Sequence, residues 1–487
     1  MKILLIIPPG GYYAERWSGG VLMPPLGIGY VAASLENTPH DVRLLDAHVG
    51  RMTDRDVQMV VENEKPDVVG LTFTTENRFE AFATARAIRE AAPGCHLTAG
   101  GPHVSLAATD TLEGVSVFDS VVAGEGEITM VELVEALSTG REQDLGKIGG
   151  LVYRDSDGAI RSNPVRDRIM DLDSIPFPAR HLYPPMSDYH FQFEVPGKGI
   201  RQFSNLMTSR GCPCACNFCA TPKVWGRQVR MRSPENIMSE IDLMVERHGA
   251  QALWFFDDTF NSSPNRVRKL CAMIRDRKYD LPWFCEVRVD QMSKDLLADM
   301  RDAGCYTIGF GVESGSQRIL DDVVGKHLKL EKVHELYGWC RELDVIANPF
   351  FILSHPTETW EEARMTIDLI RKFRESAQVS MAFMHVYPGT DLEREARRIG
   401  TLPSDFKWHQ EGRTDVKTLP SAQGNVPIFL DRLSWSQVSD LLFEWAEMQH
   451  YSVWRKIPKV LRSIRSMDDV KRYGVMGWRY LRRRLSR

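Results

Sequence analysis

The chain lacks the features that would assign it to a membrane, secreted or nucleic-acid-binding class. No run of 18 apolar residues occurs in its 487 residues, so we expect no transmembrane segment. The apolar start MKILLIIPP is ended by Pro8 and Pro9, and we expect no signal peptide. There is no long-period repeat, no low-complexity segment and no helix-turn-helix pattern, and a net charge of −4 gives no reason to expect nucleic acid as a partner. These absences predict a globular protein of the cytoplasm.

The cysteines are too few and too unevenly placed for a disulfide framework. There are nine, an odd number, and four of them lie within the eight residues 212–219 of the segment TSRGCPCACNFCATP. The other five are scattered through apolar or helical contexts: Cys95, Cys271, Cys285, Cys305 and Cys340. A tight group of cysteines in a reducing compartment predicts a metal site.

The length predicts two or three domains, and the pattern divides the chain into four segments: 1–140, 141–200, 201–425 and 426–487. In the first segment, short apolar runs alternate with amphipathic ones. The expected strands are 2–7, 41–47, 66–75, 96–102 and 120–127, and the expected helices are 24–36, 77–92 and 128–137. This alternation predicts an α/β, doubly wound, Rossmann-like domain, which binds ligands at the carboxyl ends of its strands.

The remaining segments predict a connection, a second α/β domain and a tail. Residues 141–200 hold a hairpin with an Asp-Gly turn and a Pro-rich linker. Six further strands are expected at 202–210, 252–258, 283–290, 306–314, 345–354 and 379–388, with helices such as 234–249 and 293–304 between them. This spacing suits a partial (β/α)6 barrel of TIM type, with its chemistry at the carboxyl ends of the strands. The tail is expected to be helical, and residues 451–487 carry twelve Lys and Arg against two Asp.

Cys212, Cys216 and Cys219 form the pattern C-x3-C-x2-C on a loop that follows a predicted strand. Thiolates are the usual ligands of iron–sulfur clusters, and three of them leave the fourth iron of a cubane open to the amino and carboxylate groups of a small molecule. Cys214 lies inside the pattern and leaves open a structural zinc site with four cysteine ligands.

With Phe218 before its last cysteine, this motif resembles that of the radical S-adenosyl-L-methionine (SAM) superfamily. Arg-Gly-Cys-Pro ahead of it is common in members with an N-terminal cobalamin-type domain. The resemblance implies that Cys212, Cys216 and Cys219 are the catalytic, metal-ligating residues of a 4Fe-4S cluster. Such a cluster cleaves SAM reductively to a 5′-deoxyadenosyl radical. Cys214 departs from the family pattern, so the choice of ligands rests partly on spacing.

The resemblance also implies a SAM site at the carboxyl ends of the barrel strands. Asp257 and Asp258 would accept hydrogen bonds from the methionyl ammonium, and either could instead cap a helix. Arg288 would pair with the SAM carboxylate, unless it forms a structural ion pair with a neighbour such as Asp290. Glu313 would bind the ribose hydroxyls.

The adenine would lie between Phe218 and the stretch FILSHPTETWEE. In that stretch Ser354 and Thr357 replace two glycines of the family pattern F-I-x-G-x-P-G-E-T. His355, between them, would line the adenine wall, contact substrate or simply belong to the core. Tyr387, in the sixth-strand stretch HVYPGTDL, would face substrate or pack.

Four stretches of the first segment resemble cobalamin-binding domains: PPLGIGYVAA, TFTT, AGGPHVSL and VVAGEGE. The cofactor-binding residues implied are Thr74, Thr75, Gly100, Gly101, His103, Gly124, Glu125 and Gly126. The stretch DAHVG has Arg51 where the axial-histidine motif D-x-H-x-x-G has glycine, so we expect His48 not to bind cobalt. Any cobalamin would be bound without a histidine ligand, or the domain would persist as a scaffold.

Together these resemblances imply a cobalamin-dependent methyltransferase that acts on an unactivated carbon or phosphorus of a small-molecule or secondary-metabolite substrate. A reductant such as flavodoxin or ferredoxin would be its partner. Two alternatives stay open. One is a radical SAM enzyme that performs cyclisation, dehydration or oxygen insertion, and the other is a non-catalytic cobalamin or metal sensor. The basic tail would cap the barrel, dock an electron donor or touch a membrane surface.

Overall fold

The computed structural model describes residues 1–10, 23–375, 377–413, 415–418, 426–442 and 444–449. Residues Met1–Asp431 form one compact unit, and a second begins at Arg432. In the second, residues 435–442 and 444–449 are helical. The basic stretch 451–487 lies outside the described residues. No helix in the described part of the chain is both long enough and apolar enough to cross a membrane.

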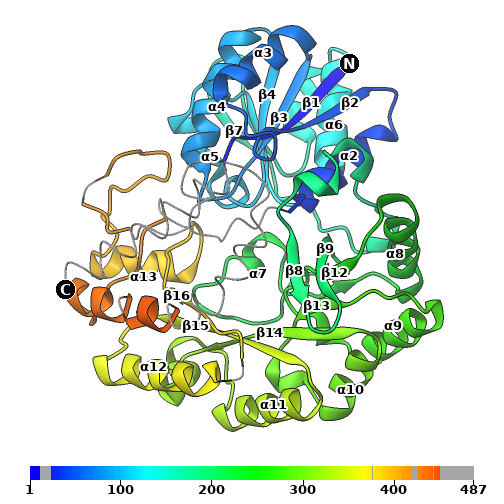
Figure 1. Cartoon of the computed structure of the whole chain (residues 1–487). Helices are drawn as coiled ribbons and strands as arrows, with labels where there is room; N and C mark the ends of the chain where they lie inside the picture. The colour runs from blue at the N-terminus through cyan, green and yellow to red at the C-terminus, as the bar shows by residue number, and fades with distance from the viewer. Residues whose placement is uncertain (11–22, 376, 414, 419–425, 443, 450–487) are drawn as a thin grey trace. The chain divides into compact units, whose positions relative to one another are not determined.

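A seven-stranded sheet in the order β2-β1-β3-β4-β5-β6-β7 builds the N-terminal part (Figure 1). Its first five strands are parallel, which confirms the predicted doubly wound domain. The strands are β1 (Lys2–Ile7), β2 (Asp41–Asp46), β3 (Val68–Thr72), β4 (His96–Gly100), β5 (Ser120–Val122), β6 (Leu151–Arg154) and β7 (Ile160–Ser162). The predicted hairpin is β6–β7, and it extends this sheet rather than standing apart in a linker.

Helices cover both faces of the first sheet because its strands are apolar on both sides. Ile3 and Leu5 pack in one core cluster with α2 and α6, whereas Leu4 and Ile6 pack in another with α3, α4 and α5. The helices are α2 (Leu26–Glu36), α3 (Asp54–Glu64), α4 (Arg78–Ala91), α5 (Val104–Gly114) and α6 (Gly126–Ser138). Neither α3 nor α5 was among the expected helices.

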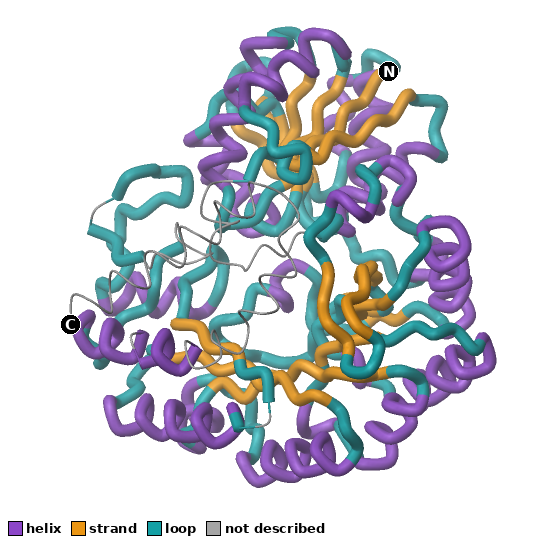
Figure 2. The backbone as a smooth tube through the Cα atoms, in the orientation of Figure 1, coloured by secondary structure: helices purple, strands orange, loops and turns teal. Residues whose placement is uncertain are grey.

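The second sheet runs in the order β16-β15-β14-β13-β12-β9-β8 (Figure 2). Six of its strands are parallel, which confirms the partial barrel, and only β8 is antiparallel. The strands are β8 (Gln192–Val195), β9 (Gly199–Leu206), β12 (Ala252–Phe255), β13 (Trp283–Glu286), β14 (Cys305–Glu313), β15 (Ile346–Leu353) and β16 (Ser380–Phe383). The helices outside it are α8 (Pro234–His248), α9 (Pro264–Arg277), α10 (Lys294–Asp302), α11 (Leu330–Glu342) and α12 (Trp360–Arg374), and α13 (Asp391–Ile399) follows β16.

Local sequence signals fix where the outer helices begin and end. Ser233 accepts a hydrogen bond at the start of α8, and Gly249 ends that helix in the left-handed conformation. Thr359 and Glu362 form a capping box at the start of α12. The ends of these two helices are therefore specified by the local sequence.

The interior of the second sheet is accessible to solvent. Along β15, Ala347, Phe351 and Leu353 face the outer helices and are buried, whereas Phe350 and Ile352 face the interior and are partly exposed. A closed barrel would fill its interior with side chains. The alternation along β15 thus leaves room for a ligand inside the curve of the sheet.

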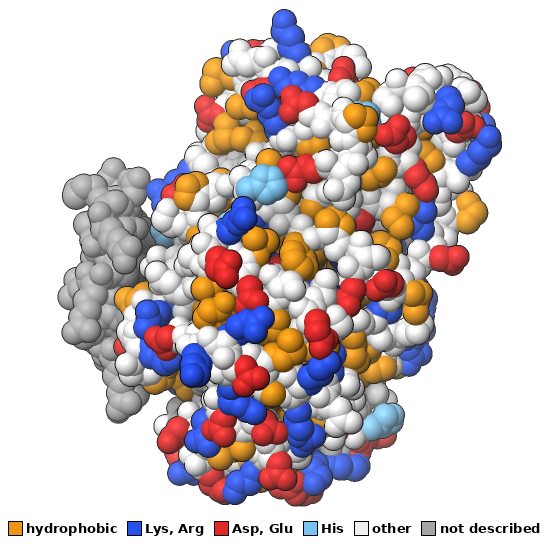
Figure 3. Space-filling view, turned by 90° about the vertical axis from the view of Figure 1, so that its right-hand side faces the viewer, with side chains coloured by type: hydrophobic (Ala, Val, Ile, Leu, Met, Phe, Trp, Pro, Cys, Tyr) orange, Lys and Arg blue, Asp and Glu red, His pale blue; other side chains and the backbone are white. Residues whose placement is uncertain are grey.

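On the face drawn in Figure 3, Lys and Arg side chains are interspersed with Asp and Glu. No patch of one sign gathers on the part of this face that is described. This distribution agrees with the small net charge of the chain.

Candidate functional site

The four clustered cysteines lie on one loop, residues 211–229, which is closed at its base by two short strands. These strands, β10 (Ser209–Arg210) and β11 (Arg230–Met231), pair antiparallel with Arg210 opposite Arg230. Within the loop, the Cys212 amide donates to the carbonyl of Gly226 (3.1 Å). Gly211 has φ +101°, and a Cβ there would lie 2.3 Å from the Gln228 carbonyl oxygen. The base of the loop is therefore tightly packed.

All four thiols of this loop are partly exposed and none is in a disulfide. A hydrogen bond from Cys214 lowers the pKa of the Cys212 thiol to about 5, whereas burial raises the pKa of the Cys216 thiol to about 11. The described residues contain no group of three or more His, Cys, Asp or Glu side chains already drawn together as metal ligands. The structure thus places the three predicted ligands on one loop without joining them. Their chemistry, several thiols on a glycine-broken loop, fits an iron–sulfur cluster.

Asp257, expected to contact an ammonium group, has a structural role in the folded chain. It is 2% exposed, and its carboxylate accepts the amides of Thr208 (2.6 Å) and Ser209 (3.2 Å) and the Thr208 hydroxyl. The guanidinium of Arg266 lies 3.8 Å away. Asp257 therefore fixes the end of β9 that leads into the cysteine loop, and both of its carboxylate oxygens already accept hydrogen bonds from that segment.

Asp258 and Glu286 are the carboxylates that remain available at this end of the sheet. Asp258 accepts one hydrogen bond, from the Thr221 hydroxyl (2.9 Å), and burial raises the pKa of its carboxyl group to about 6. Glu286, at the end of β13, was not anticipated. Burial raises its pKa to about 7, and repulsion from Asp258 and Glu313 adds to the shift. Its sequence signal, a single acid at the end of an apolar strand, was too weak to interpret.

Glu313 ends β14 with φ +68° and is nearly buried. Its carboxylate pairs with Lys326 (2.7 Å), whose ammonium also donates to the carbonyl of Gly311 (2.7 Å). Lys326 was not anticipated. The pair places an ammonium and a carboxylate near the Cys216 thiol, where Lys326 lowers and Glu313 raises the pKa of that thiol.

Arg288 forms an ion pair with Asp290, the structural alternative to a ligand role. Its Nε and Nη2 donate to the two carboxylate oxygens (2.9 and 2.7 Å). Its Nη1 donates to the sulfur of Cys214. Arg288 therefore contacts Cys214, the cysteine that departs from the family pattern.

The turn after β15 keeps the shape of a glycine turn although it lacks the glycines. Ser354 and Thr357 have φ of +71° and +59°, the conformation that the two glycines of the resembling pattern would adopt easily. Glu358, which was not anticipated, accepts the amides of Ser354 (2.6 Å) and His355 (3.2 Å). Burial raises the pKa of Glu358 to about 8. Ser354 is buried and donates to the carbonyl of Phe429 (2.6 Å), so its hydroxyl is already used.

Phe218 and His355 meet across the mouth of the sheet. Their rings are T-shaped at 6.4 Å. His355 is 1% exposed, and burial lowers the pKa of its imidazole to about 4, so it is a neutral side chain of the core. Tyr387 donates to the Glu76 carboxylate (2.8 Å), which joins the segment after β16 to the loop after β3.

An apolar cavity of about 330 Å³ opens at the carboxyl ends of the parallel strands of the first sheet. Six of the eight residues expected to bind cobalamin line it: Thr74, Gly100, Gly101, Gly124, Glu125 and Gly126. A Cβ placed on Gly27 or Gly100 would meet no atom within 4 Å, so both glycines border open space in the cavity. Val224 and Trp225 of the cysteine loop form part of the same wall.

Thr75 and His103, the other two residues expected to bind cobalamin, are not among the residues that line this cavity. The Thr75 hydroxyl and His103 Nδ1 share a hydrogen bond (3.1 Å), and both side chains are buried. Burial lowers the pKa of His103 to about 3. His48 lies against the backbone of Gly10, where a Cβ would collide with its ring. Both histidines therefore have packing roles.

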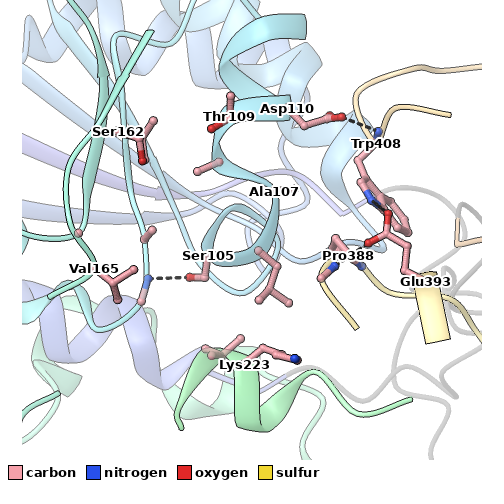
Figure 4. Close-up of a pocket in the computed structure, with 18 of the residues that line it drawn as sticks. Ser105, Ala107, Thr109, Asp110, Ser162, Val165, Lys223, Pro388, Glu393 and Trp408 are labelled. Carbon is pink, nitrogen blue, oxygen red and sulfur yellow. Dashed lines mark hydrogen bonds between the residues drawn. The ribbon is translucent and has the colours of Figure 1, made fainter. Parts of the chain in front are cut away.

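A second cavity of about 640 Å³ adjoins the first and shares with it Ser105, Gly124, Glu125 and Val224. Figure 4 shows its walls: α5 with Asp110, the segment after β7 with Val165, Lys223 of α7 (Thr221–Val224), and the segment that carries Trp408. Ser105 donates to the carbonyl of Gly101 (2.9 Å) and accepts the amide of Gly124 (3.0 Å). It thereby ties together the two glycine loops.

Comparison with known proteins bears on both parts of the chain. The B12 binding domain matches residues 18–134, and the radical SAM superfamily matches residues 206–370. An uncharacterized methyltransferase of Pyrococcus horikoshii is 34% identical over 393 residues, which are 80% of this chain and 82% of that protein. Cytidylyl-2-hydroxyethylphosphonate methyltransferase of Streptomyces wedmorensis is 27% identical over 446 residues, 81% of this chain and 82% of that protein. The structure of the radical SAM methyltransferase TsrM from Kitasatospora setae, with cobalamin and a 4Fe-4S cluster bound, shares the fold with a TM-score of 0.68 at 18% identity, over 89% of this chain and 84% of that one.

Proposed function

This chain belongs to the radical SAM enzymes that carry an N-terminal B12-binding domain, and we propose that it is a cobalamin-dependent methyltransferase of a small molecule. In such an enzyme the cluster and SAM supply a carbon radical, and cobalamin supplies the methyl group. The methyl acceptor is an unactivated carbon or a phosphorus, and its source is secondary metabolism. The name of the Streptomyces relative, a phosphonate methyltransferase, supports a small phosphorus-containing substrate.

One observation carries the proposal: the apolar cavity of the first domain and the cysteine loop share a wall. Val224 and Trp225, a few residues after Cys219, line the cavity, and Glu125 lines it from the other side. Two cofactors held at these places would lie next to each other, as transfer of a methyl group between them and a substrate requires.

The residues of the chain would divide the work as follows. Cys212, Cys216 and Cys219 would hold the cluster, and Asp258 and Glu286 would accept hydrogen bonds from the SAM ammonium. Glu313 and Phe218 would bind the adenosyl part. The glycines around the apolar cavity would admit the flat base of the cobalamin tail, because an apolar slot without side chains suits an aromatic ring.

The described residues that line the apolar cavity include no histidine, which supports binding without a histidine ligand. His103 is buried and His48 packs against Gly10, and neither is among the residues that line the cavity. The cobalamin would therefore be held by the loops and not through its metal.

Anaerobic purification with hydroxocobalamin tests the proposal. The chain is expected to retain cobalamin after gel filtration and, after cluster reconstitution, to transfer the deuterated methyl group of labelled SAM to its substrate. A product with no added methyl mass would support cyclisation, dehydration or oxygen insertion instead. A chain that retains no cobalamin and does not need it would overturn the methyltransferase assignment.

A further inference from the structure

A buried group of four charges joins the first domain to the base of the cysteine loop. The Glu125 carboxylate accepts hydrogen bonds from Arg210 (2.9 Å), from Arg230 (2.8 Å) and from the amide of Ile169 (2.9 Å). Arg210 donates with its other nitrogen to Glu127 (2.6 Å). Two acids at the start of α6, its N-cap Glu125 and Glu127 of its first turn, thus meet two arginines of the second domain.

The two arginines are partners in the ladder that closes the cysteine loop. Arg210 pairs with Arg230 across β10 and β11, and Cys212 lies two residues beyond Arg210. One carboxylate, that of Glu125, therefore grips both ends of the segment that carries all four cysteines. The planar guanidinium of Arg210 reaches Glu125 and Glu127 at once, which a lysine ammonium at the end of a flexible stem would not do in the same geometry.

Burial makes this link rigid. The four side chains are between 1% and 7% exposed, and the Arg210 guanidinium lies 5.0 Å from the Tyr30 ring and 5.1 Å from the Trp225 ring. To separate a buried ion pair leaves an uncompensated charge out of contact with water. The start of α6 and the base of the cysteine loop are therefore expected to move together.

The apolar cavity touches both sides of the link. Gly124, Glu125 and Gly126 line the cavity from the first domain, and Trp225 lines it from the cysteine loop. A ligand in the cavity would hold these two walls at a fixed separation, and so would favour the closed ladder. The same closed ladder brings the ends of the cysteine loop together.

We propose that Arg210 is a positioning residue that couples cobalamin binding in the first domain to assembly of the cluster on the cysteine loop. The inference rests on the proposed function, since it takes cobalamin as the occupant of the cavity. By linkage, the cluster must strengthen cobalamin binding by the same factor as cobalamin strengthens cluster binding.

The test compares the dissociation constant of hydroxocobalamin before and after anaerobic cluster reconstitution, and the iron content per chain with and without hydroxocobalamin. In the wild-type chain we expect the cluster to tighten cobalamin binding by about tenfold, within the usual range of such couplings. The coupling ratio is the dissociation constant of hydroxocobalamin before cluster reconstitution divided by that after it. In Arg210→Lys, cobalamin and the cluster are both still expected to bind, and the coupling ratio is expected to fall close to one. Glu127→Gln keeps the side-chain shape and replaces the lysine variant if that one does not fold. It is also expected to lower the coupling ratio.

Glu240→Gln is the matched control. Glu240 is likewise buried between two arginines, Arg180 (2.7 Å) and Arg232, but it contacts neither the start of α6 nor the cysteine loop. It should keep the wild-type coupling ratio. A coupling ratio of one in the wild-type chain would overturn the coupling. So would a coupling ratio in Arg210→Lys equal to that of the wild-type chain. In either case, cobalamin binding itself would still support the proposed function. A wild-type chain that bound no hydroxocobalamin would overturn both.

Discussion

Gly27→Leu would fill the apolar cavity without harming the fold. Gly27 lies in the first turn of α2 and lines the cavity, and a Cβ placed on it would meet no atom within 4 Å. Leucine is a better helix former than glycine by up to about 1 kcal/mol, so the free energy of unfolding should stay unchanged or rise. The added carbons would occupy part of the 330 Å³ that we assign to the cobalamin tail.

The expected loss of affinity follows from the cost of overpacking. Forcing extra methylenes into an occupied site costs about 1–3 kcal/mol, which corresponds to hydroxocobalamin binding that is weaker by about 5- to 150-fold. Equilibrium dialysis measures the dissociation constant, and urea denaturation measures the stability. Gly338→Leu, in α11, is the control, because Gly338 also faces open space in a helix but does not line the cavity. Unchanged cobalamin affinity in Gly27→Leu, with the fold intact, would refute the assignment of the cavity.

Further predictions concern the second domain. The single variants C212A, C216A and C219A should each lose iron content and visible absorbance after reconstitution, whereas C214A should keep both. The reverse result would show that the cluster ligands are misassigned. Asp257→Asn should lower the free energy of unfolding by about 1–3 kcal/mol, because it weakens buried hydrogen bonds. Asp258→Asn should instead weaken SAM binding without loss of stability, because burial already raises the pKa of its carboxyl group; the opposite pattern would return Asp257 to the ligand site. Glu286 has its pKa raised from 4.5 to about 7 in the folded chain, so the folded state binds the proton more tightly and stability falls as pH rises from about 4.5 through 7, by at most about 3 kcal/mol. Glu286→Gln should remove this loss of stability. Urea denaturation at pH 5 and pH 8 measures it, and an equal change in the free energy of unfolding between the two pH values in both chains would contradict the prediction.

Most of the fold could be predicted from periodicity, and the exceptions have physical causes. The eleven parallel strands of the two sheets are apolar runs bounded by turn residues, so they were predicted in their order along the chain, whereas the short strands β8, β10 and β11 were not. Helix α3 was missed because only Val57 and Val61 of its eleven residues are buried. Helix α5 was missed because it is interrupted at Ala107, which has non-helical dihedrals.

The parts of the site that depend on the spacing of residues along the chain could be predicted. The parts that depend on which way a side chain points could not. Asp257 and Asp258 are neighbours at the end of one strand, and successive side chains there point to opposite faces. The sequence does not tell which of the two meets the core, and the buried one proved to be Asp257. The pair of Glu125 and Arg210 spans 85 residues and two domains. Neither side chain carries a local signal of the other, so only the folded chain shows that they meet.

The central claim is that one chain holds a radical SAM cluster and a cobalamin side by side. The most direct test incubates the reconstituted chain with SAM and a reductant, with and without hydroxocobalamin, and measures 5′-deoxyadenosine and S-adenosylhomocysteine by mass spectrometry. We predict 5′-deoxyadenosine in both reactions and S-adenosylhomocysteine only when cobalamin is present. Absence of 5′-deoxyadenosine from a cluster-loaded chain, or S-adenosylhomocysteine formed equally without cobalamin, would contradict the account.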